Sequence, residues 1–180
     1  MPIYIAMLRG INVGGQKIVS MEKLRASFEK LGFGRVRTYV QSGNVIFEAS
    51  KASSDIFSKS IEEEILGDFG FSVPLVLRSS DEMKKIDNDN PFLKDRGIDH
   101  SKLHVTFLSE LPAKAGLGKL DSLNAVPDQF RIKGQEVYLY CPNGYGRTRL
   151  SNTTFEKLLS VQATTRNWKT VKTLVEMSSE

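Results

Sequence analysis

Glycines and cations are concentrated in one short stretch near the start of the chain, and this combination is suited to binding anions. Residues 8–19 read LRGINVGGQKIV, with three glycines between two cations. Glycine permits positive φ angles and a close approach of the backbone, so successive N–H groups in such a loop can converge on an anion. A nucleotide-binding P-loop would need Lys directly after its last glycine and then Ser or Thr, whereas Gln16, Lys17 and Ile18 stand here. The stretch therefore predicts either a phosphate or carboxylate site, or a turn that only reverses the chain.

Two cationic groups near the other end of the chain are also suited to anions. Residues 166–169, RNWK, place a guanidinium, an amide, an aromatic face and an ammonium at a predicted helix start, which suits a base or a phosphate. The structural alternative makes Trp168 a buried anchor and Asn167 a helix cap. Arg147 and Arg149 belong to a second glycine-containing loop directly before a predicted helix, where an anion would gain from the helix dipole.

The signs of catalysis are weaker than the signs of binding. The polar turn 41–44, QSGN, offers groups that can position a ligand, but no recognisable general base accompanies it. The sequence therefore names no catalytic residue and leaves open whether the protein is an enzyme. His100 and His104 would lie about 13 Å apart along a strand, too far to share an ion, so no metal site and no cofactor are predicted. The predicted ligand-binding residues are Arg9, Gly10, Asn12, Gly14, Gly15, Lys17, Gln41, Ser42, Asn44, Arg147, Arg166, Asn167 and Trp168.

Hydrophobic spacing predicts the elements of the first half that must position these residues. Residues 3–8 are apolar on both faces, as in a central strand that is covered on both sides. Ser20 can cap a helix that closes at Gly32, and a second helix spans 54–69. The remaining elements are a hairpin of strands over 36–41 and 44–48, and a strand over 73–77 that contains Pro74 and is therefore assigned to a sheet edge.

The second half begins the same order again after a short connecting helix with a capping box at Ser79 and Glu82. A strand over 103–107 and a helix at 117–124 precede a hairpin that turns at 133–134, and Thr153 and Glu156 can cap the next helix. Where a fourth strand would be expected, Trp168, Val171, Leu174 and Val175 show helical spacing instead. The predicted fold class is α/β (α+β), with two ferredoxin-like βαββαβ-type halves, the second ending in helix. The predicted domains are residues 1–78, a connecting helix and loop over 79–100, and residues 101–180.

Four motifs resemble one bacterial family, the domain of unknown function 1697. They are LRGINVGG at 8–15, QSGN at 41–44, NPF at 90–92 and TRNWKT at 165–170. The resemblance covers nearly the whole chain and implies an α/β protein built from two ferredoxin-like halves. It implies no established activity, so it carries over no catalytic residue. Arg147 and Arg149 depart from the family, whose members more often show Ser or Lys there.

Composition sets broad limits on location and partners. The net charge of +4 and the pI near 9.1 favour an anionic partner only mildly, but both ends of the chain are basic and the middle is acidic. A single cysteine, Cys141, excludes an intramolecular disulfide and is better explained as a packed thiol than as a nucleophile. No signal peptide or run of transmembrane length is recognisable, so we expect a soluble cytoplasmic protein with no membrane partner.

Three hypotheses follow from these patterns. The first is a module that binds an anionic, phosphate-bearing small molecule or nucleic acid. Nucleic acid is the weaker of the two, because strand 44–48 shows only one of the aromatics that an RNA-recognition sheet displays. The second is an enzyme that acts on such a ligand, and the third is a homo-oligomeric interaction protein without catalysis, although the sequence does not determine an oligomeric state. We also expect residues 9–17, 41–44 and 166–169 to meet in one cleft.

Overall fold

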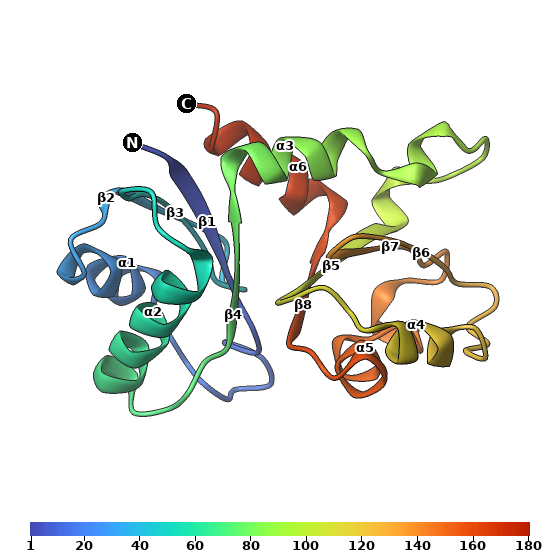
Figure 1. Cartoon of the computed structure of the whole chain (residues 1–180), viewed down its shortest axis with the longest axis horizontal. Coiled ribbons are helices and arrows are strands. Elements are labelled where there is room, and N and C mark those ends of the chain that lie inside the picture. The colour runs from blue at the N-terminus through green and yellow to red at the C-terminus, as the bar shows by residue number, and fades with distance from the viewer. The chain divides into compact units, whose positions relative to one another are not determined.

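The structure is a computed structural model that describes all 180 residues. The chain forms two compact units, one made of Met1–Lys84 and Leu174–Glu180 and the other of Lys85–Thr173. Each unit contains a four-stranded antiparallel sheet, and the last element of the chain is a helix (Figure 1). The predicted α+β class with two similar halves is therefore confirmed. No helix has both the length and the apolar character needed to cross a bilayer.

The first unit has the ferredoxin-like strand order β2-β3-β1-β4. As predicted, the first strand and the second strand of the hairpin are central, and every neighbouring pair is antiparallel. The elements are β1 (Ile3–Leu8), α1 (Met21–Lys30), β2 (Gly34–Tyr39), β3 (Asn44–Glu48), α2 (Ser54–Phe69) and β4 (Leu75–Ser79).

Both helices of this unit pack on the same face of the sheet (Figure 1). Alternate residues of β1 contribute Tyr4, Ala6 and Leu8 to that face, because successive side chains of a strand point to opposite sides. The predicted helix positions Leu24, Phe28, Phe57 and Ile61 all belong to this one core.

The predicted ends of the first helices are confirmed, but two strands are shifted by two residues: 36–41 is Gly34–Tyr39, and 73–77 is Leu75–Ser79. The hydroxyl of Ser20 accepts a hydrogen bond from the N–H of Lys23 (3.1 Å), and Gly70 ends α2 with a left-handed φ of 79°. The prediction that Pro74 lies within a strand is wrong, because β4 begins one residue later. It is an edge strand as predicted, and the carbonyl of Pro74 accepts from the N–H of Arg9 (2.9 Å). The strand β2 begins at Gly34 rather than residue 36, and its pairing with β3 contains a register shift.

The second unit repeats the topology with the order β6-β7-β5-β8. The unit boundaries fall inside α3 (Ser80–Asn88) and α6 (Trp168–Met177). The capping box of α3 is confirmed, since the N–H of Ser79 donates to Glu82 (2.7 Å) and the N–H of Glu82 donates to the hydroxyl of Ser79 (3.2 Å). The other elements are the 3₁₀ turns η1 (Pro91–Lys94), η2 (His100–Lys102) and η3 (Tyr145–Arg147), the strands β5 (Leu103–Leu108), β6 (Gln129–Lys133), β7 (Glu136–Tyr140) and β8 (Ala163–Asn167), and the helices α4 (Lys114–Leu120) and α5 (Asn152–Leu159).

Three predictions for the second half are wrong. The helix expected at 117–124 is α4, which spans Lys114–Leu120 and so begins three residues earlier and ends four residues earlier. A fourth strand does exist, because β8 pairs with β5 along its whole length and α6 only begins after it. Its sequence, ATTRN, lacks the apolar alternation by which strands are recognised, although threonine itself favours strands. The helix α5 is capped by the hydroxyl of Ser151, which accepts from the N–H of Thr154 (3.3 Å), and not by Thr153. Glu156 instead accepts from the N–H of Ala163 (3.2 Å).

Candidate functional site

The side chain of Asn12 holds the glycine-rich loop in place. Its Nδ2 donates to the carbonyl oxygens of Val19 (3.0 Å) and Gln41 (2.8 Å), and its Oδ1 accepts from the N–H of Val19 (2.8 Å). Both amide hydrogens are therefore used inside the protein, which gives Asn12 a structural role at φ 55°. Asparagine tolerates this left-handed conformation better than most residues, so its type and its backbone geometry agree.

The predicted meeting of this loop with the turn 41–44 is confirmed. The N–H of Leu8 donates to the carbonyl of Gly43 (2.8 Å), and Gly43 has a φ of 85°. A Cβ atom on Gly43 would lie 2.6 Å from Cδ1 of Ile11 and 3.0 Å from Cβ of Leu8, so a larger residue would have to displace these side chains as well as adopt the left-handed φ. Asn44 is buried, and its Nδ2 donates to the carbonyl of Tyr39 (2.9 Å) and to the hydroxyl of Ser42 (3.2 Å). The QSGN motif thus closes the hairpin and supports the neighbouring loop.

The glycines at the tip of the loop form a tight turn. Gly14 and Gly15 both have positive φ angles, and the N–H of Gln16 donates to the carbonyl of Val13 across them (3.1 Å). Gly10 also has a positive φ, of 72°. The ammonium of Lys17 donates to the carbonyl of Ser72 (2.8 Å), which ties the loop to the segment before β4. Ligand binding by this loop stays a prediction, but the contacts and backbone angles already give structural reasons for Asn12, Lys17 and the glycines.

The cationic group at 166–169 is mostly built into the fold. Arg166 is only 6% exposed, and its Nη1 donates to the hydroxyl of Thr164 (2.7 Å) and the carbonyl of Thr165 (3.0 Å). Burial lowers the pKa of its guanidinium to about 10. The Oδ1 of Asn167 accepts from the N–H of Thr170 (2.8 Å), so Asn167 caps α6, and Trp168 is buried. The structural alternative is therefore observed for Asn167 and Trp168. Convergence of this group with the loop 9–17 would join residues of different units and stays a prediction.

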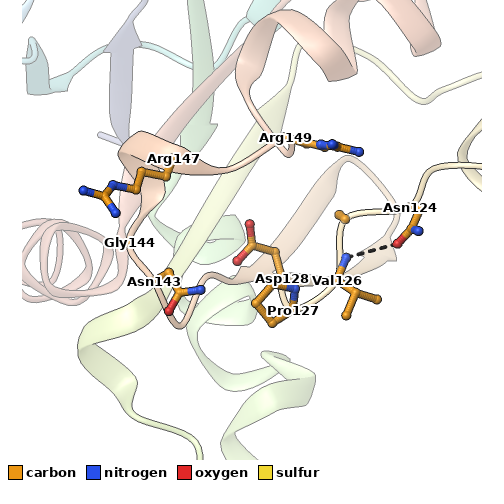
Figure 2. A pocket seen from close by; sticks show the side chains of 9 residues that line it. Asn124, Val126, Pro127, Asp128, Asn143, Gly144, Arg147 and Arg149 are labelled. Carbon is orange, nitrogen blue, oxygen red and sulfur yellow. Dashed lines mark hydrogen bonds between the residues drawn. The ribbon is translucent and has the colours of Figure 1, made fainter.

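The second unit contains a pocket of about 520 Å³, which we call the Arg147 pocket (Figure 2). It lies between the segment that leads into β6 and the segment that follows β7. Its lining residues are Asn124, Ala125, Val126, Pro127, Asp128, Asn143, Gly144, Arg147 and Arg149.

Hydrogen bonds within two turns shape the walls of the Arg147 pocket. On one side, the Oδ1 of Asn124 accepts from the N–H of Val126 (3.3 Å), and the N–H of Asp128 donates to the carbonyl of Ala125 (2.8 Å). On the other, the N–H of Gly144 donates to the carbonyl of Cys141 (3.0 Å), and Gly144 has a φ of 94°. The β6–β7 hairpin brings the turns together, since Gln129 at the start of β6 pairs with Tyr140 at the end of β7.

The charged side chains of the Arg147 pocket are not used by the fold. Neither Arg147 nor Arg149 makes an ion pair or a side-chain hydrogen bond, and both are exposed. In Figure 2 their guanidinium groups point in opposite directions, and the carboxylate of Asp128 lies between them in that view. By contrast, Arg35 pairs with Glu48 (3.0 Å) and Arg131 with Asp95 (2.7 Å). The unpaired guanidinium groups are therefore available to a ligand.

Stacked rings support the turn that carries Arg147. The ring of His104 in β5 stacks on Tyr145 in η3, with centroids 4.9 Å apart and planes inclined by 23°. The hydroxyl of Tyr145 also accepts from the N–H of Asn152 (3.3 Å), and Asn152 in turn accepts from the hydroxyl of Thr165. Burial lowers the pKa of His104 below its ordinary value, which favours the neutral imidazole.

The thiol of Cys141, which follows β7, is not activated for nucleophilic attack. Cys141 is fully buried, and burial raises the pKa of its thiol to about 11. A nucleophilic cysteine needs the thiolate form near neutral pH, so the structure agrees with the packed thiol that the sequence suggested. No group of three or more His, Cys, Asp or Glu side chains is arranged to hold a metal ion.

The sequence predicts the arginines of the Arg147 pocket but not its other polar residues. Nothing marks Asp128, Asn124 and Asn143 as site residues, because short turns such as NAVPD and PNG are typical of ordinary loops. The predicted hairpin indicates that these residues lie close together. Since its strands are antiparallel, the residues before the first strand and after the second must lie at the same end of the hairpin.

Comparison with known proteins gives a family and a fold. The family model described as "Protein of unknown function (DUF1697)" matches residues 1–138. The structure of the conserved bacterial protein SP0830 from Streptococcus pneumoniae is similar, with a TM-score of 0.77 and 22% sequence identity over 98% of each chain. At that identity the similarity concerns the fold alone. No curated protein matches the chain.

Proposed function

This chain belongs to the DUF1697 family of proteins of unknown function, and from its site alone we propose that it binds a small phosphate-bearing anion in the Arg147 pocket. The observation that carries the proposal is the pair of unpaired guanidinium groups of Arg147 and Arg149 at one pocket. Guanidinium groups bind phosphate with charge-assisted hydrogen bonds and are permanently charged. A volume of about 520 Å³ lies within the range of small-molecule sites.

The distribution of hydrogen bonds favours this pocket over the glycine-rich loop. In the loop, the side chains of Asn12 and Lys17 donate to backbone carbonyls of the same unit. A ligand that bound there through these groups would have to replace those contacts, whereas Arg147 and Arg149 lose only water. Binding at the Arg147 pocket therefore costs less reorganisation of the protein.

Calorimetric titration with inorganic phosphate and with ribose 5-phosphate at low ionic strength tests the proposal. Arg147→Ala and Arg149→Ala should each weaken binding of the tighter probe. A hydrogen bond to a charged group contributes about 1.5–3 kcal/mol, so we expect a loss of roughly 10- to 150-fold for each variant.

Arg96→Ala is the matched control, because Arg96 is an exposed arginine of the same unit that does not line the pocket. It removes the same charge, so it should change the affinity by less than about twofold if only long-range attraction is lost. Equal losses of affinity in all three variants would show that net charge, and not a direct contact with the phosphate, causes the effect. Failure of the unmodified protein to bind either probe would contradict the proposal.

A further inference from the structure

The Arg147 pocket contains a carboxylate that a simple phosphate site does not need. Asp128 is half-buried beside Arg147 and Arg149 in the lining, and it forms an ion pair with neither of them. No hydrogen bond to its carboxylate is present. A bare phosphate in the same pocket would be repelled by this negative charge, and the repulsion is stronger near a protein surface than in bulk water.

An ionised carboxylate only accepts hydrogen bonds, so a partner for Asp128 has to donate. Hydroxyl groups donate without adding positive charge, and acidic side chains bind the ribose hydroxyls of dinucleotides in this way. The neighbouring amides fit the same chemistry. Asn124 uses its Oδ1 to accept from Val126, which leaves its Nδ2 as a donor to hydroxyl oxygens, and Asn143 has no hydrogen-bond partner for its side chain.

The size of the pocket also exceeds what phosphate alone requires. A water molecule takes about 30 Å³ in the liquid, so about 520 Å³ corresponds to roughly seventeen water-sized groups. This volume accommodates a monosaccharide with its phosphate. In Figure 2, Asp128 and Asn143 lie below the two arginines and Asn124 lies beyond Arg149, so groups that accept and donate hydrogen bonds line the pocket beside the cations.

We propose that the ligand of the Arg147 pocket is a phosphorylated polyol, with its phosphate held by Arg147 and Arg149 and its hydroxyl groups by Asp128 and the two asparagines. This inference rests on the proposed function and specifies the ligand class. The same chemistry is offered by a free sugar phosphate and by the sugar-phosphate part of a ribonucleotide.

The change Asp128→Asn tests the inference because it keeps the shape of the side chain while removing its charge. With the unmodified protein, we expect ribose 5-phosphate to bind at least tenfold more tightly than inorganic phosphate. In the Asp128→Asn variant, inorganic phosphate should bind more tightly because the repulsion is gone. The phosphate of ribose 5-phosphate gains from the same relief, but its hydroxyl groups lose a charged acceptor, so ribose 5-phosphate should bind no more tightly than to the unmodified protein. The preference should fall below about threefold.

Asp121→Asn is the matched control, since Asp121 is an exposed aspartate of the same unit outside the pocket. It should leave the preference unchanged. One further probe, adenosine 5′-monophosphate, separates the two sources of the ligand. Adenosine 5′-monophosphate binding tenfold more tightly than ribose 5-phosphate would assign a ribonucleotide, and equal or weaker binding would assign a free sugar phosphate. Both results support a polyol phosphate.

Two failures can be told apart. If inorganic phosphate binds in an Arg147-dependent manner but ribose 5-phosphate binds no more tightly, the polyol inference is overturned and the proposed function stands. The same holds if Asp128→Asn strengthens both probes equally. If no phosphate-bearing probe binds, both are overturned. Circular dichroism of each variant shows that a loss of binding does not come from unfolding.

Discussion

Side chains of the same type stabilise the fold at one position and remain available to a ligand at another. The difference is whether their hydrogen-bonding groups already have partners within the protein. The side-chain amide of Asn12 donates hydrogen bonds to backbone carbonyls 7 and 29 residues away. The side-chain amide of Asn143 makes no hydrogen bond within the protein and can bind solvent or a ligand. The sequence could identify Arg147 as a candidate and Asn167 as a possible cap, because those inferences depend on near neighbours. It could not show that Asn12 is occupied, because the partner carbonyl of Gln41 approaches only when the sheet is assembled.

Gly43→Ala should destabilise the protein by about 2–4 kcal/mol. The methyl group would meet Cδ1 of Ile11 at 2.6 Å, and a left-handed φ of 85° costs alanine further energy. Gly67→Ala is the control, since Gly67 lies inside α2 with nothing within 4 Å of the added atom. It should stabilise the protein by roughly 0.5–1 kcal/mol. Urea denaturation measures both changes, and Ile11→Val, which removes Cδ1, should reduce the cost of Gly43→Ala.

His104 should make the stability depend on pH in the mildly acidic range. Burial lowers its pKa below the ordinary value of 6.5, so below about pH 6.5 the unfolded chain binds a proton that the folded protein does not. The free energy of unfolding should therefore fall as the pH is lowered from 6.5. A backbone hydrogen bond at Lys102 opposes the lowering of the pKa, and the charge of Lys102 adds to it, but burial is the largest cause. His104→Phe keeps a ring on Tyr145 and removes the titration.

Urea midpoints at pH 7.5 and pH 5.5 provide the measurement for His104. The variant should lose less stability than the unmodified protein over this interval, and His100→Gln, which removes the other histidine, serves as the comparison. An identical loss in the His104→Phe variant would assign the pH dependence to other groups.

At the scale of elements, the sequence succeeds where periodicity is strong and fails where polar residues form a strand. The helix over 54–69 was predicted to the residue, because apolar positions and a terminal glycine mark it clearly. The strand β8 is not recognisable from the sequence, because its residues ATTRN lack apolar alternation. Its backbone pairs with β5, and its threonine side chains form hydrogen bonds with neighbouring side chains. Thr165, for example, shares a hydrogen bond of 2.7 Å with Thr106. The repeated order of elements predicts this strand better than the local amino-acid composition does.

Asn12→Asp should loosen the glycine-rich loop without unfolding the sheet. An aspartate can still accept from the N–H of Val19, but its second oxygen would face the carbonyls of Val19 and Gln41 where Nδ2 now donates. Leaving those carbonyls without a donor costs about 1–3 kcal/mol. Amide hydrogen exchange should accelerate at Asn12 and Val19.

The hairpin β6–β7 provides the internal control for this loop variant. Its amides should exchange at their original rates, because it belongs to the other unit. Accelerated exchange throughout the chain would show a general loss of stability and would remove the local role assigned to Asn12.

At the scale of the whole molecule, the two units repeat the strand order and the register of the fourth strand against the first. Arg78 in β4 lies opposite Ile5, the third residue of β1, and Arg166 in β8 lies opposite Val105, the third residue of β5. Both arginines are buried at the same place in a fourth strand that leads directly into a helix. The halves share this geometry without obvious residue identity, so the sequence revealed the duplication only through the order of its elements.

Arg37 should be necessary for order at the end of the chain. Its guanidinium donates to the carboxylate of Glu180 (2.6 Å) and to the carbonyl of Met177, which fixes the last turn of α6 against β2 within the first unit. Lysine cannot make both contacts with the same geometry. In the Arg37→Lys variant we expect faster exchange of the amides of Ser178 and Ser179. Arg25→Lys, on the surface of α1, should leave those rates unchanged.

The assembly of the first unit from two distant segments sets an order of events during synthesis. Its sheet is complete once residue 79 has been made, but residues 174–180 follow only after the whole second unit. At about 5–20 residues per second, translation of residues 85–173 takes roughly 4–18 s. Throughout that interval Arg37 has no Glu180 and Ser80 has no Ser178 to bind. The unit whose translation begins first is therefore the last of the two to be finished.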